Sequence, residues 1–567
     1  MLYQWIFKEA PPPEEISLLH QRSNTNPLLA QLLLERNLGT PEKVDKFFNP
    51  DLKDLHDPYL MRDMEVAVSR ITKALRDGEN ILIYGDYDVD GITGVSLLYE
   101  ALFKLGGKIS FYIPNRITEG YGLSREGVRL AATKKVNLIL TVDCGITAVD
   151  EVAYARECGI EVIICDHHEP GEQLPKAYAV LDPKLPDCPY PFKELAGVGV
   201  GFKLLQALYT SLGYGISDLK QFLDLVAIGT AADIVPMLDE NRIMVKVGLE
   251  QINTNPRRGV FALLESCSLL GRELDVSLIV FILAPRINAV GRMSAAKKAV
   301  HLLTSTSLQQ SRNIARLLES ENKKRRGIDE TTCQEAIVLA EEQIARYDAK
   351  ILVLAKEGWH PGVIGIVASR IMEKFNRPTI LISLREGIGK GSARSTTNFD
   401  IYHALKDVEH ILDNFGGHKF AAGLTVREEN VEFLRNQMQI ITDPLISKDD
   451  LIPTLEVESE VSLRLLDASF LKSLKQFAPY GPQNMRPVFV SKAVEVVGDI
   501  QVVGSNHLKF KLKQDGIVID AIAYNFAEYR DKMKPSRQLI DAAYVIEENT
   551  WNGRTTIQMR VKDFILV

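Results

Sequence analysis

Five short apolar runs lie between residues 80 and 185, with helix-like stretches between them. Within each run the hydrophobic residues follow one another without alternation, which is typical of strands buried on both faces of a parallel sheet. The spacing predicts βαβ units and therefore a first α/β domain. The runs are Ile81–Tyr84, Ile109–Ile113, Leu138–Val142, Val162–Cys165 and Ala179–Leu181.

Beyond residue 294 the pattern changes twice. Apolar positions at helical spacing predict long connecting helices, and the run Ile351–Leu354 opens a second α/β segment. Later, apolar and polar residues alternate, as in Leu508–Lys513, which predicts the strands of a small β-barrel. We therefore expect an α/β protein of five parts. They are an N-terminal helical extension (1–50), a catalytic α/β domain (51–294), connecting helices (295–347), a second α/β domain (348–445) and the barrel (446–567).

The composition narrows the class of protein. A length of 567 residues, with 46% hydrophobic and 25% charged residues, is ordinary for a soluble chain of several domains. No run of about 18 uncharged apolar residues appears, so we expect no membrane span. The acidic, proline-rich start argues against a signal peptide. Six cysteines without a CxxC pair indicate reduced thiols and predict a cytoplasmic location.

The formal net charge of −7 weakens a nucleic-acid-binding hypothesis, because contacts with phosphates require Lys and Arg. Net charge is only a sum, however, and a carboxylate-rich metal site can lower the total while a basic groove lies elsewhere. The charge therefore does not exclude a nucleic-acid substrate.

Acidic residues follow three of the predicted strands directly. Asp86, Asp143 and Asp166 each stand at the carboxyl end of an apolar run. Ligand sites in open α/β sheets lie at this edge, so we expect three acidic loops to converge there.

The first of these loops carries three carboxylates at alternate positions, in Asp86-Tyr87-Asp88-Val89-Asp90-Gly91. Such carboxylates repel one another unless cations neutralise them, and hard oxygen ligands suit Mg²⁺ or Mn²⁺. A calcium-binding loop and a solvated turn are the alternatives for this motif taken alone.

Three further motifs add acids and imidazoles. Asp143, followed by a cysteine and a glycine, could by itself be a helix cap. Asp166-His167-His168 ends another run, and imidazole nitrogen favours Mn²⁺ over Mg²⁺. Asp233 stands in an almost uncharged run and needs a partner, which could be a metal, an arginine or a helix end. Together the four motifs predict a two-metal site for phosphoryl hydrolysis.

At these four motifs, in this order, the sequence resembles the DHH phosphoesterase family, named for the Asp-His-His triplet. The resemblance implies two bound ions, Mn²⁺ or Mg²⁺, bridged by Asp143. It also implies catalytic roles for Asp143, His168 and Asp86, with His168 contacting the scissile phosphate or transferring a proton. The implied metal ligands are Asp88, Asp90, Asp143, His167 and Asp233.

Three features resemble the RecJ-type exonucleases within this family. Trp359–Arg370, Gly391–Ser395 and the tract Gly416-Gly417-His418 resemble a DHH-associated domain. The stretch Ala284–Met293 is also similar, and the C-terminal barrel resembles an OB-fold. The resemblance implies a metal-dependent hydrolase that degrades single-stranded DNA from its 5′ end to mononucleotides, in DNA repair and recombination.

The same resemblance implies a pocket for the 5′-terminal phosphate. Guanidinium groups match phosphate geometry, and a glycine-rich loop at 387–391 would let main-chain N–H groups approach it. Pairing of Arg116 with Glu119 and a structural role for His418 are the alternatives. The implied phosphate- or DNA-binding residues are Arg116, Arg292, Ser392, Arg394 and His418.

An OB-fold binds single strands by base stacking, and four aromatic residues are candidates either for stacking or for the core: Phe477, Tyr480, Tyr524 and Phe526. We expect single-stranded DNA as substrate, a single-strand-binding protein and a RecQ-type helicase as partners, and a monomer. A phosphodiesterase acting on oligoribonucleotides or cyclic dinucleotides is the alternative, but it leaves the barrel without a purpose. An inactive DNA-binding scaffold is disfavoured because every expected ligand is present.

Overall fold

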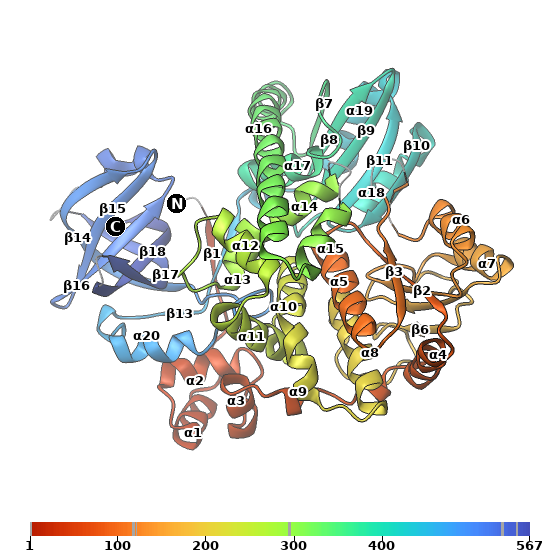
Figure 1. The fold of residues 1–567 in the computed structure, drawn as a ribbon. Helices are drawn as coiled ribbons and strands as arrows, with labels where there is room; N and C mark the ends of the chain where they lie inside the picture. Colours follow the sequence, from red (N-terminus) through yellow and green to blue (C-terminus); the bar gives the residue numbers. More distant parts are fainter. Residues whose placement is uncertain (1–2, 116–118, 121, 293–295, 534–537, 552–553) are drawn as a thin grey trace. The chain divides into compact units, whose positions relative to one another are not determined.

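The computed structural model describes residues 3–115, 119–120, 122–292, 296–533, 538–551 and 554–567, and Figure 1 labels its elements. The chain folds into two compact units. The larger unit contains Pro11–Asn322 and Lys472–Arg486, and the smaller unit contains Met1–Ala10, Lys323–Leu471 and Pro487–Val567. The chain therefore passes four times from one unit to the other.

A five-stranded parallel sheet, in the order β3-β2-β4-β5-β6, forms the centre of the larger unit. Its strands coincide with the five predicted apolar runs, and every residue of the central strand β4 is buried. The strands are β2 (Asn80–Gly85), β3 (Lys108–Tyr112), β4 (Leu138–Val142), β5 (Glu161–Cys165) and β6 (Ala179–Leu181).

Helices α5 and α8 pack on this sheet, and α10 packs against both of them. Among the described residues no helix combines the length and apolar character that a membrane span requires. The helices of this unit are α1 (Pro13–Ser23), α2 (Pro27–Leu34), α3 (Pro41–Phe48), α4 (Met64–Asp77), α5 (Val89–Lys104), α6 (Arg125–Thr133), α7 (Val149–Glu157), α8 (Gly197–Ser211), α9 (Ile216–Leu219), α10 (Leu223–Ala232), α11 (Asp239–Thr254), α12 (Arg258–Ser266), α13 (Val276–Leu278), α14 (Ala284–Arg292) and α15 (Ala296–Thr304).

Residues 1–50 differ in part from the predicted helical extension. Helices α1 to α3 are present, but Gln4–Phe7 form strand β1, which pairs in parallel with β12 (Thr454–Val457) of the smaller unit. The Trp5 indole N–H donates a hydrogen bond of 3.0 Å to the buried carboxylate of Asp563, which helps to fix this strand. A short strand whose partner lies so far along the chain leaves no periodic signal in the local sequence.

Arg242 of α11 binds the segment Lys472–Arg486 to the rest of the larger unit. The buried guanidinium donates five hydrogen bonds of 2.7–3.2 Å to main-chain carbonyls and lies 3.7 Å from the centre of the Phe47 ring. Burial lowers the pKa of Arg242 to about 9. The accepting carbonyls belong to Phe47, Gln476, Phe477 and Pro479.

A second five-stranded sheet, in the order β10-β11-β9-β8-β7, lies in the smaller unit. Only β7 and β8 are parallel to each other. The helix predicted to join the two α/β domains is α16 (Leu308–Tyr347), a single helix of 40 residues. The remaining elements are β7 (Leu352–Glu357), α17 (Ile364–Phe375), β8 (Thr379–Arg385), β9 (Ile388–Arg394), α18 (Ile401–Asp407), β10 (Leu412–His418), β11 (Ala421–Arg427) and α19 (Val431–Thr442).

The glycine-rich stretch 387–391 is not the phosphate-binding loop expected from the sequence. Most of it belongs to β9, which pairs with β8 on one side and β11 on the other. A Cβ atom on Gly391 would lie 2.7 Å from the Leu424 side chain, and one on Gly389 would lie 2.6 Å from Ile382. These glycines therefore admit close packing over the sheet, while their main-chain groups are used within it.

The C-terminal β-barrel runs in the order β14-β15-β16-β18-β17 and is closed by pairing of β14 with β17. Leu508, Phe510 and Leu512 of β15 are buried, so the alternating lysines of this strand face outward, as the period of two predicts. The strands are β14 (Phe489–Val503), β15 (His507–Gln514), β16 (Ile517–Tyr524), β17 (Leu539–Trp551) and β18 (Arg554–Leu566); β13 (Ser459–Glu460) extends the sheet, and α20 (Ala468–Lys475) precedes the barrel.

Candidate metal centre and active site

Three parallel strands deliver buried carboxylates to one edge of the sheet in the larger unit. Asp86 follows β2, Asp143 follows β4 and Asp166 follows β5, and each residue is at most 2% exposed. The convergence expected from the sequence is therefore present in the structure.

The first loop turns tightly into α5. Asp88 caps this helix and accepts a hydrogen bond of 3.1 Å from the Gly91 N–H. A Cβ on Gly91 would lie within 2.7 Å of the Asp86 main chain, which explains the glycine at the end of the acidic motif. In the first turn of α5, the buried Asp90 accepts hydrogen bonds from the main-chain N–H groups of Gly197 (2.6 Å) and Val198 (2.9 Å) at the start of α8.

His167 lies among three carboxylates. Its Nε2 atom is 3.1 Å from Asp143 Oδ1, 3.7 Å from Asp233 Oδ2 and 3.8 Å from Asp90 Oδ2. Asp143 has a positive φ of 61°, and a Cβ on Gly197 would lie 2.6 Å from the Asp143 Cβ. The backbone is therefore shaped to let the start of α8 approach this carboxylate closely.

Asp166 has a different task from the two histidines that follow it. Its carboxylate accepts hydrogen bonds from His168 Nδ1 (2.7 Å) and from the main-chain N–H groups of Ile146 (2.9 Å) and His167 (2.8 Å). Burial opposes its ionisation, but the hydrogen bond and positive charge of His168 outweigh burial and lower the pKa of Asp166. Through these hydrogen bonds Asp166 fixes the main chain of His167 and the ring orientation of His168.

The side chains form three groups whose potential ligand atoms all lie within 4.8 Å of one another. Asp143 belongs to two of these groups, and so does His167. The groups are Asp86 with Asp88 and Asp143, Asp90 with His167 and Asp233, and Asp143 with His167 and His168.

The electrostatics of this cluster fit a divalent cation. Burial, followed by the charge of Asp88, raises the pKa of Asp90 to about 7. Burial and the neighbouring carboxylates also raise the pKa values of Asp143 and Asp233. Burial lowers the pKa of His167 to about 3, which keeps the imidazole neutral and available as a ligand. Within the described part of the chain, Asp233 Oδ2 has no hydrogen-bond donor. Hard cations that take carboxylate oxygen and neutral imidazole would neutralise this site.

The expected phosphate-binding residues are only partly described. Arg116 and the Arg292 side chain lie outside the described residues. In the smaller unit, Arg394 Nη1 donates a 3.1 Å hydrogen bond to Ser392 Oγ on β9. Both side chains lie beside Gly365 near the start of α17, where a Cβ would come 3.1 Å from each. His418 is exposed at the end of β10, where its Nδ1 accepts a 3.4 Å hydrogen bond from the Phe420 N–H.

Glu119, the alternative partner named for Arg116, lies in a network of hydrogen bonds with other described residues. The Glu119 carboxylate accepts hydrogen bonds from the Tyr112 hydroxyl (2.8 Å), the Ser124 hydroxyl (3.0 Å) and the Asn115 N–H (2.9 Å). Glu119 therefore joins Tyr112 at the end of β3 to Asn115 and Ser124.

Two parts of the site were missed at the sequence level. Asp182 follows β6, is fully buried, and accepts a 2.8 Å hydrogen bond from the Lys184 N–H. The rule that found Asp86, Asp143 and Asp166 would also have found it. The second part is the start of α8, whose N–H groups hold Asp90; its glycines and apolar residues gave no chemical signal.

The four candidate stacking residues differ in whether they lie on the surface of the barrel. Phe477 is fully buried in the larger unit and Phe526 is buried in the barrel, so both are core residues. Tyr480 also lies in the larger unit, where its hydroxyl donates a 2.8 Å hydrogen bond to the Leu474 carbonyl. Only Tyr524 stands on the barrel surface, 47% exposed, with the His507 ring 4.9 Å away on the neighbouring strand.

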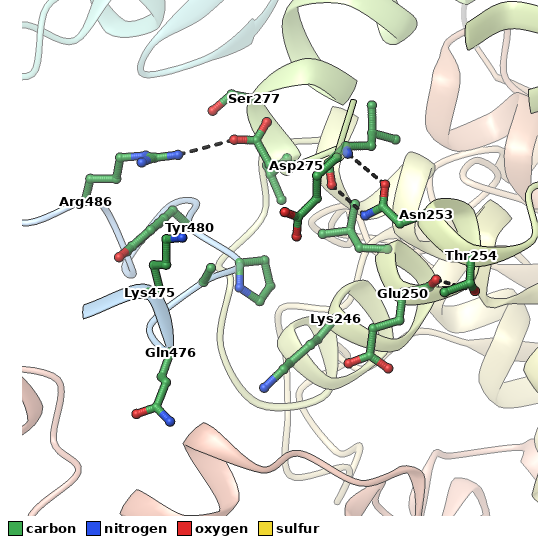
Figure 2. A pocket seen from close by; sticks show the side chains of 16 residues that line it. Lys246, Glu250, Asn253, Thr254, Asp275, Ser277, Lys475, Gln476, Tyr480 and Arg486 are labelled. Atoms are coloured by element: carbon green, nitrogen blue, oxygen red, sulfur yellow. Dashed lines mark hydrogen bonds and ion pairs between the residues drawn. The ribbon is translucent and has the colours of Figure 1, made fainter. Parts of the chain in front are cut away.

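A separate cavity of about 490 Å³ lies between α11, the loop before α13 and the segment Lys472–Arg486 (Figure 2). Its basic and acidic side chains are mixed, and Arg486 pairs with Asp275 at 3.2 Å. None of the expected catalytic or metal-binding residues line it.

Comparison with known proteins agrees with this architecture. Residues 80–230 match the DHH family, N-terminal domain, residues 348–441 match the DHHA1 domain, and residues 457–563 match the RecJ OB domain. The single-stranded-DNA-specific exonuclease RecJ of Bacillus subtilis is 38% identical over 560 residues, which cover 98% of this chain and 70% of that protein. The chain belongs to the RecJ family.

Other RecJ proteins are similar over nearly their whole length. The Escherichia coli exonuclease is 34% identical, over 94% of this chain and 95% of its own. Among solved structures, Thermus thermophilus RecJ in complex with Mn²⁺ superposes with a TM-score of 0.85 at 29% identity, covering 100% of this chain and 80% of that one. The complex of the same protein with Mg²⁺ gives a TM-score of 0.79 at 28% identity, with coverages of 99% and 78%.

Proposed function

We propose that the chain is a single-stranded-DNA-specific exonuclease that hydrolyses phosphodiester bonds from the 5′ end and releases mononucleotides. One observation carries this proposal: the buried carboxylates Asp90 and Asp143 lie together with Asp233 and the neutral His167 at the edge of a RecJ-type sheet, where they could hold a cation. Similarity to RecJ exonucleases along nearly the whole sequence supports the substrate class.

Asp88, Asp90, Asp143, His167 and Asp233 would hold two ions of Mn²⁺ or Mg²⁺. Asp143 suits the bridging position because it belongs to two of the three ligand groups and, unlike His167, offers two carboxylate oxygens. Such a pair of ions supplies an acidified water and neutralises charge on the leaving oxygen. The protein fixes the ligands: main-chain N–H groups hold Asp90, and the Leu195 main chain forms a hydrogen bond with the His167 ring.

His168 is placed to act on the reacting phosphate. Burial alone would lower its pKa, but the hydrogen bond and charge of Asp166 raise it, so the imidazole carries a proton more readily. Asp166 accepts a hydrogen bond from Nδ1, and 43% of the side chain is exposed, which suits a role in donating to a phosphate oxygen or to the departing 3′ oxygen. Asp86 contributes a further carboxylate to the group around Asp143.

Recognition of the 5′ end is proposed for Arg116, Arg292, Ser392, Arg394 and His418. Arg394 and Ser392 support this role because they form a joined guanidinium–hydroxyl pair beside Gly365. Cleavage of the bond to the 3′ oxygen leaves a new 5′-phosphate on the shortened strand, which can occupy the same pocket in the next cycle.

The single strand is proposed to run over the outward face of the barrel. Tyr524 and His507 form an exposed ring pair there, and Lys509, Lys511 and Lys513 follow on the same face of β15. Two of these lysines are near carboxylates, at 4.0 Å from Asp520 and 3.6 Å from Glu495, so stacking supplies more of the contact than charge.

The remaining proposals follow from the family. We propose a cytoplasmic monomer in DNA repair and recombination, working with a single-strand-binding protein and a RecQ-type helicase. The proposed division is a catalytic DHH domain (51–294), connecting helices (295–347), a DHH-associated domain (348–445) and an OB-fold domain (446–567), with residues 1–50 as an extension.

The test is Mn²⁺-dependent digestion of 5′-phosphorylated single-stranded DNA labelled at either end. Early release of the 5′ label as mononucleotide supports the proposal, whereas early release of the 3′ label contradicts it. A duplex degraded as fast as a single strand contradicts strand specificity. Turnover of dinucleotides alone would favour the small-substrate phosphodiesterase.

A further inference from the structure

The loop Glu194–Val198, whose last two residues begin α8, touches three of the proposed metal ligands. Its Gly197 and Val198 N–H groups bond to Asp90, and Gly197 packs against Asp143 so closely that a Cβ would lie 2.6 Å away. The His167 ring forms a hydrogen bond with the Leu195 main chain. The position of this single loop therefore sets the positions of Asp90, Asp143 and His167 together.

The fourth ligand in this neighbourhood, Asp233, comes from a different loop. Asp233 follows α10, and residues 234–238 connect it to α11. Its carboxylate lies 3.7 Å from the ring of His167, and Oδ2 has no hydrogen-bond donor among the described residues. The position of Asp233 relative to the loop Glu194–Val198 therefore depends on what holds the two main-chain segments together.

The side chain of Asn241 joins these two loops. Its Nδ2 atom donates a hydrogen bond of 2.6 Å to the Glu194 carbonyl and one of 3.0 Å to the Pro236 carbonyl. Both partners are carbonyl oxygens, so the amide nitrogen must face them. Asn241 is fully buried in the first turn of α11, so water does not compete for these two bonds.

We propose that Asn241 is a positioning residue of the metal centre, which sets the distance between Asp233 and the ligands held by the loop Glu194–Val198. The residue touches neither metal nor substrate; it acts by holding two main-chain segments at a fixed separation. This inference rests on the metal site proposed above. Outer groups of this kind typically change metal affinity by about 10–100-fold when removed.

The same helix offers a matched control. Asn253, at the other end of α11, donates a 3.0 Å hydrogen bond to the Leu274 carbonyl and accepts one of 2.7 Å from the Leu274 N–H. Figure 2 shows it beside the separate cavity, which none of the proposed ligands line. Asn253→Ala thus removes the same kind of side-chain to main-chain link from the same helix.

The experiment measures Mn²⁺ binding to the full chain without DNA, by the electron paramagnetic resonance signal of free Mn²⁺. Asn241→Ala is expected to weaken binding about 10–100-fold, and Asn241→Ser, which keeps a shorter donor, to weaken it less. Asn253→Ala should bind as the unmodified protein does. Circular dichroism establishes that each variant is folded at the temperature used.

Hydrogen exchange in the metal-free protein gives a second readout. Asn241→Ala should speed exchange of the Gly197 and Val198 amides, whereas Asn253→Ala should speed exchange at Leu274 alone. The inference is overturned if folded Asn241→Ala binds Mn²⁺ with unchanged affinity, or if Asn253→Ala weakens binding equally. It is also overturned if both Asn241 variants fail to fold, because the residue is then structural. Mn²⁺ binding is independent of nuclease activity, so failure of the proposed exonuclease function would leave this result standing.

Discussion

Two carboxylate clusters in the larger unit differ in how their negative charge is compensated. Asp224 and Glu100 surround the guanidinium of Arg257, at 2.5 and 2.8 Å. Burial alone would raise the pKa of Glu100, but Arg257, together with Lys104, outweighs it and lowers that pKa. In the metal centre Asp90 and Asp143 lie close to the neutral ring of His167 and to other carboxylates, and their pKa values are raised.

The difference separates a structural ion network from a binding site. Where a guanidinium fills the centre of a cluster, the protein completes its own charge balance during folding. Where carboxylates are crowded around a neutral imidazole, binding of a cation from solution neutralises their negative charge. A buried acid is thus informative only together with what faces it.

The largest expected effect is loss of activity on removing the shared carboxylate. Asp143→Ala should reduce the rate of single-stranded DNA digestion at least about 10³-fold, more than the loss of one transition-state hydrogen bond usually costs. Initial rates at saturating Mn²⁺ measure it. Asp224→Asn, assayed at a temperature where it is folded, should retain activity. A variant at position 143 with near-normal rates would break the comparison.

Stability should respond in the opposite sense. Asp224→Asn removes one partner of a buried pair and should lower the unfolding free energy of the metal-free protein by about 3–5 kcal/mol. Asp143→Asn removes a carboxylate whose ionisation burial and its neighbours oppose, and should leave that free energy unchanged or raise it. Denaturant titrations in EDTA compare the two. Equal destabilisation by both substitutions would show that the clusters are alike.

Metal should stabilise the unmodified protein and not the ligand variant. At a free Mn²⁺ concentration of about 100 times the dissociation constant, linkage predicts about 2.7 kcal/mol of added stability. Thermal unfolding with and without Mn²⁺ measures it, and Asp143→Ala should show no shift at the same concentration. An equal shift in both proteins would place the Mn²⁺ elsewhere.

The smallest expected effect is a difference between the two clusters in how their stability depends on pH. Asp90 has a raised pKa of about 7, so between the ordinary carboxyl value of about 4 and pH 7 the folded metal-free protein binds more protons than the unfolded chain. Its stability contribution is therefore lost as pH rises through this window. Glu100 has a lowered pKa, so its contribution is lost only as pH falls below the ordinary range. Melting temperatures in EDTA from about pH 4.5 to 8 should decline in the unmodified protein and less steeply in Asp90→Asn; parallel profiles would contradict the assignment.

The sequence predicted those parts of the molecule that follow a local pattern. Strands β2 to β6 were identified because residues buried on both faces leave unbroken apolar runs, and Asp86, Asp143 and Asp166 followed from strand direction. Strand β1 was missed because its partner is distant in sequence. Likewise, nothing local marks Phe477 as a core residue, because its neighbours Phe47 and Phe48 come from the opposite end of the chain.

At the site, the residues with metal-binding side chains could be predicted from the sequence, but the residue that positions them could not. The five proposed ligands could be named because they stand in motifs that resemble those of the DHH family. Asn241 could not, because its partners are the carbonyls of Glu194 and Pro236, and a carbonyl has no sequence signature. The glycines of β9 were assigned to a loop because close packing and loop flexibility both favour glycine; only the strand pairing separates them.

The buried guanidinium of Arg242 constrains how this chain is made. Three of its accepting carbonyls belong to Gln476, Phe477 and Pro479, which the ribosome adds long after Asn322, where the first stretch of the larger unit ends. At synthesis rates of about 5–20 residues per second that interval lasts roughly 8–31 s. During it the Arg242 guanidinium has only the Phe47 carbonyl among its final acceptors. The smaller unit's α/β sheet is synthesised in the meantime, so this protein cannot complete its parts strictly in the order of translation.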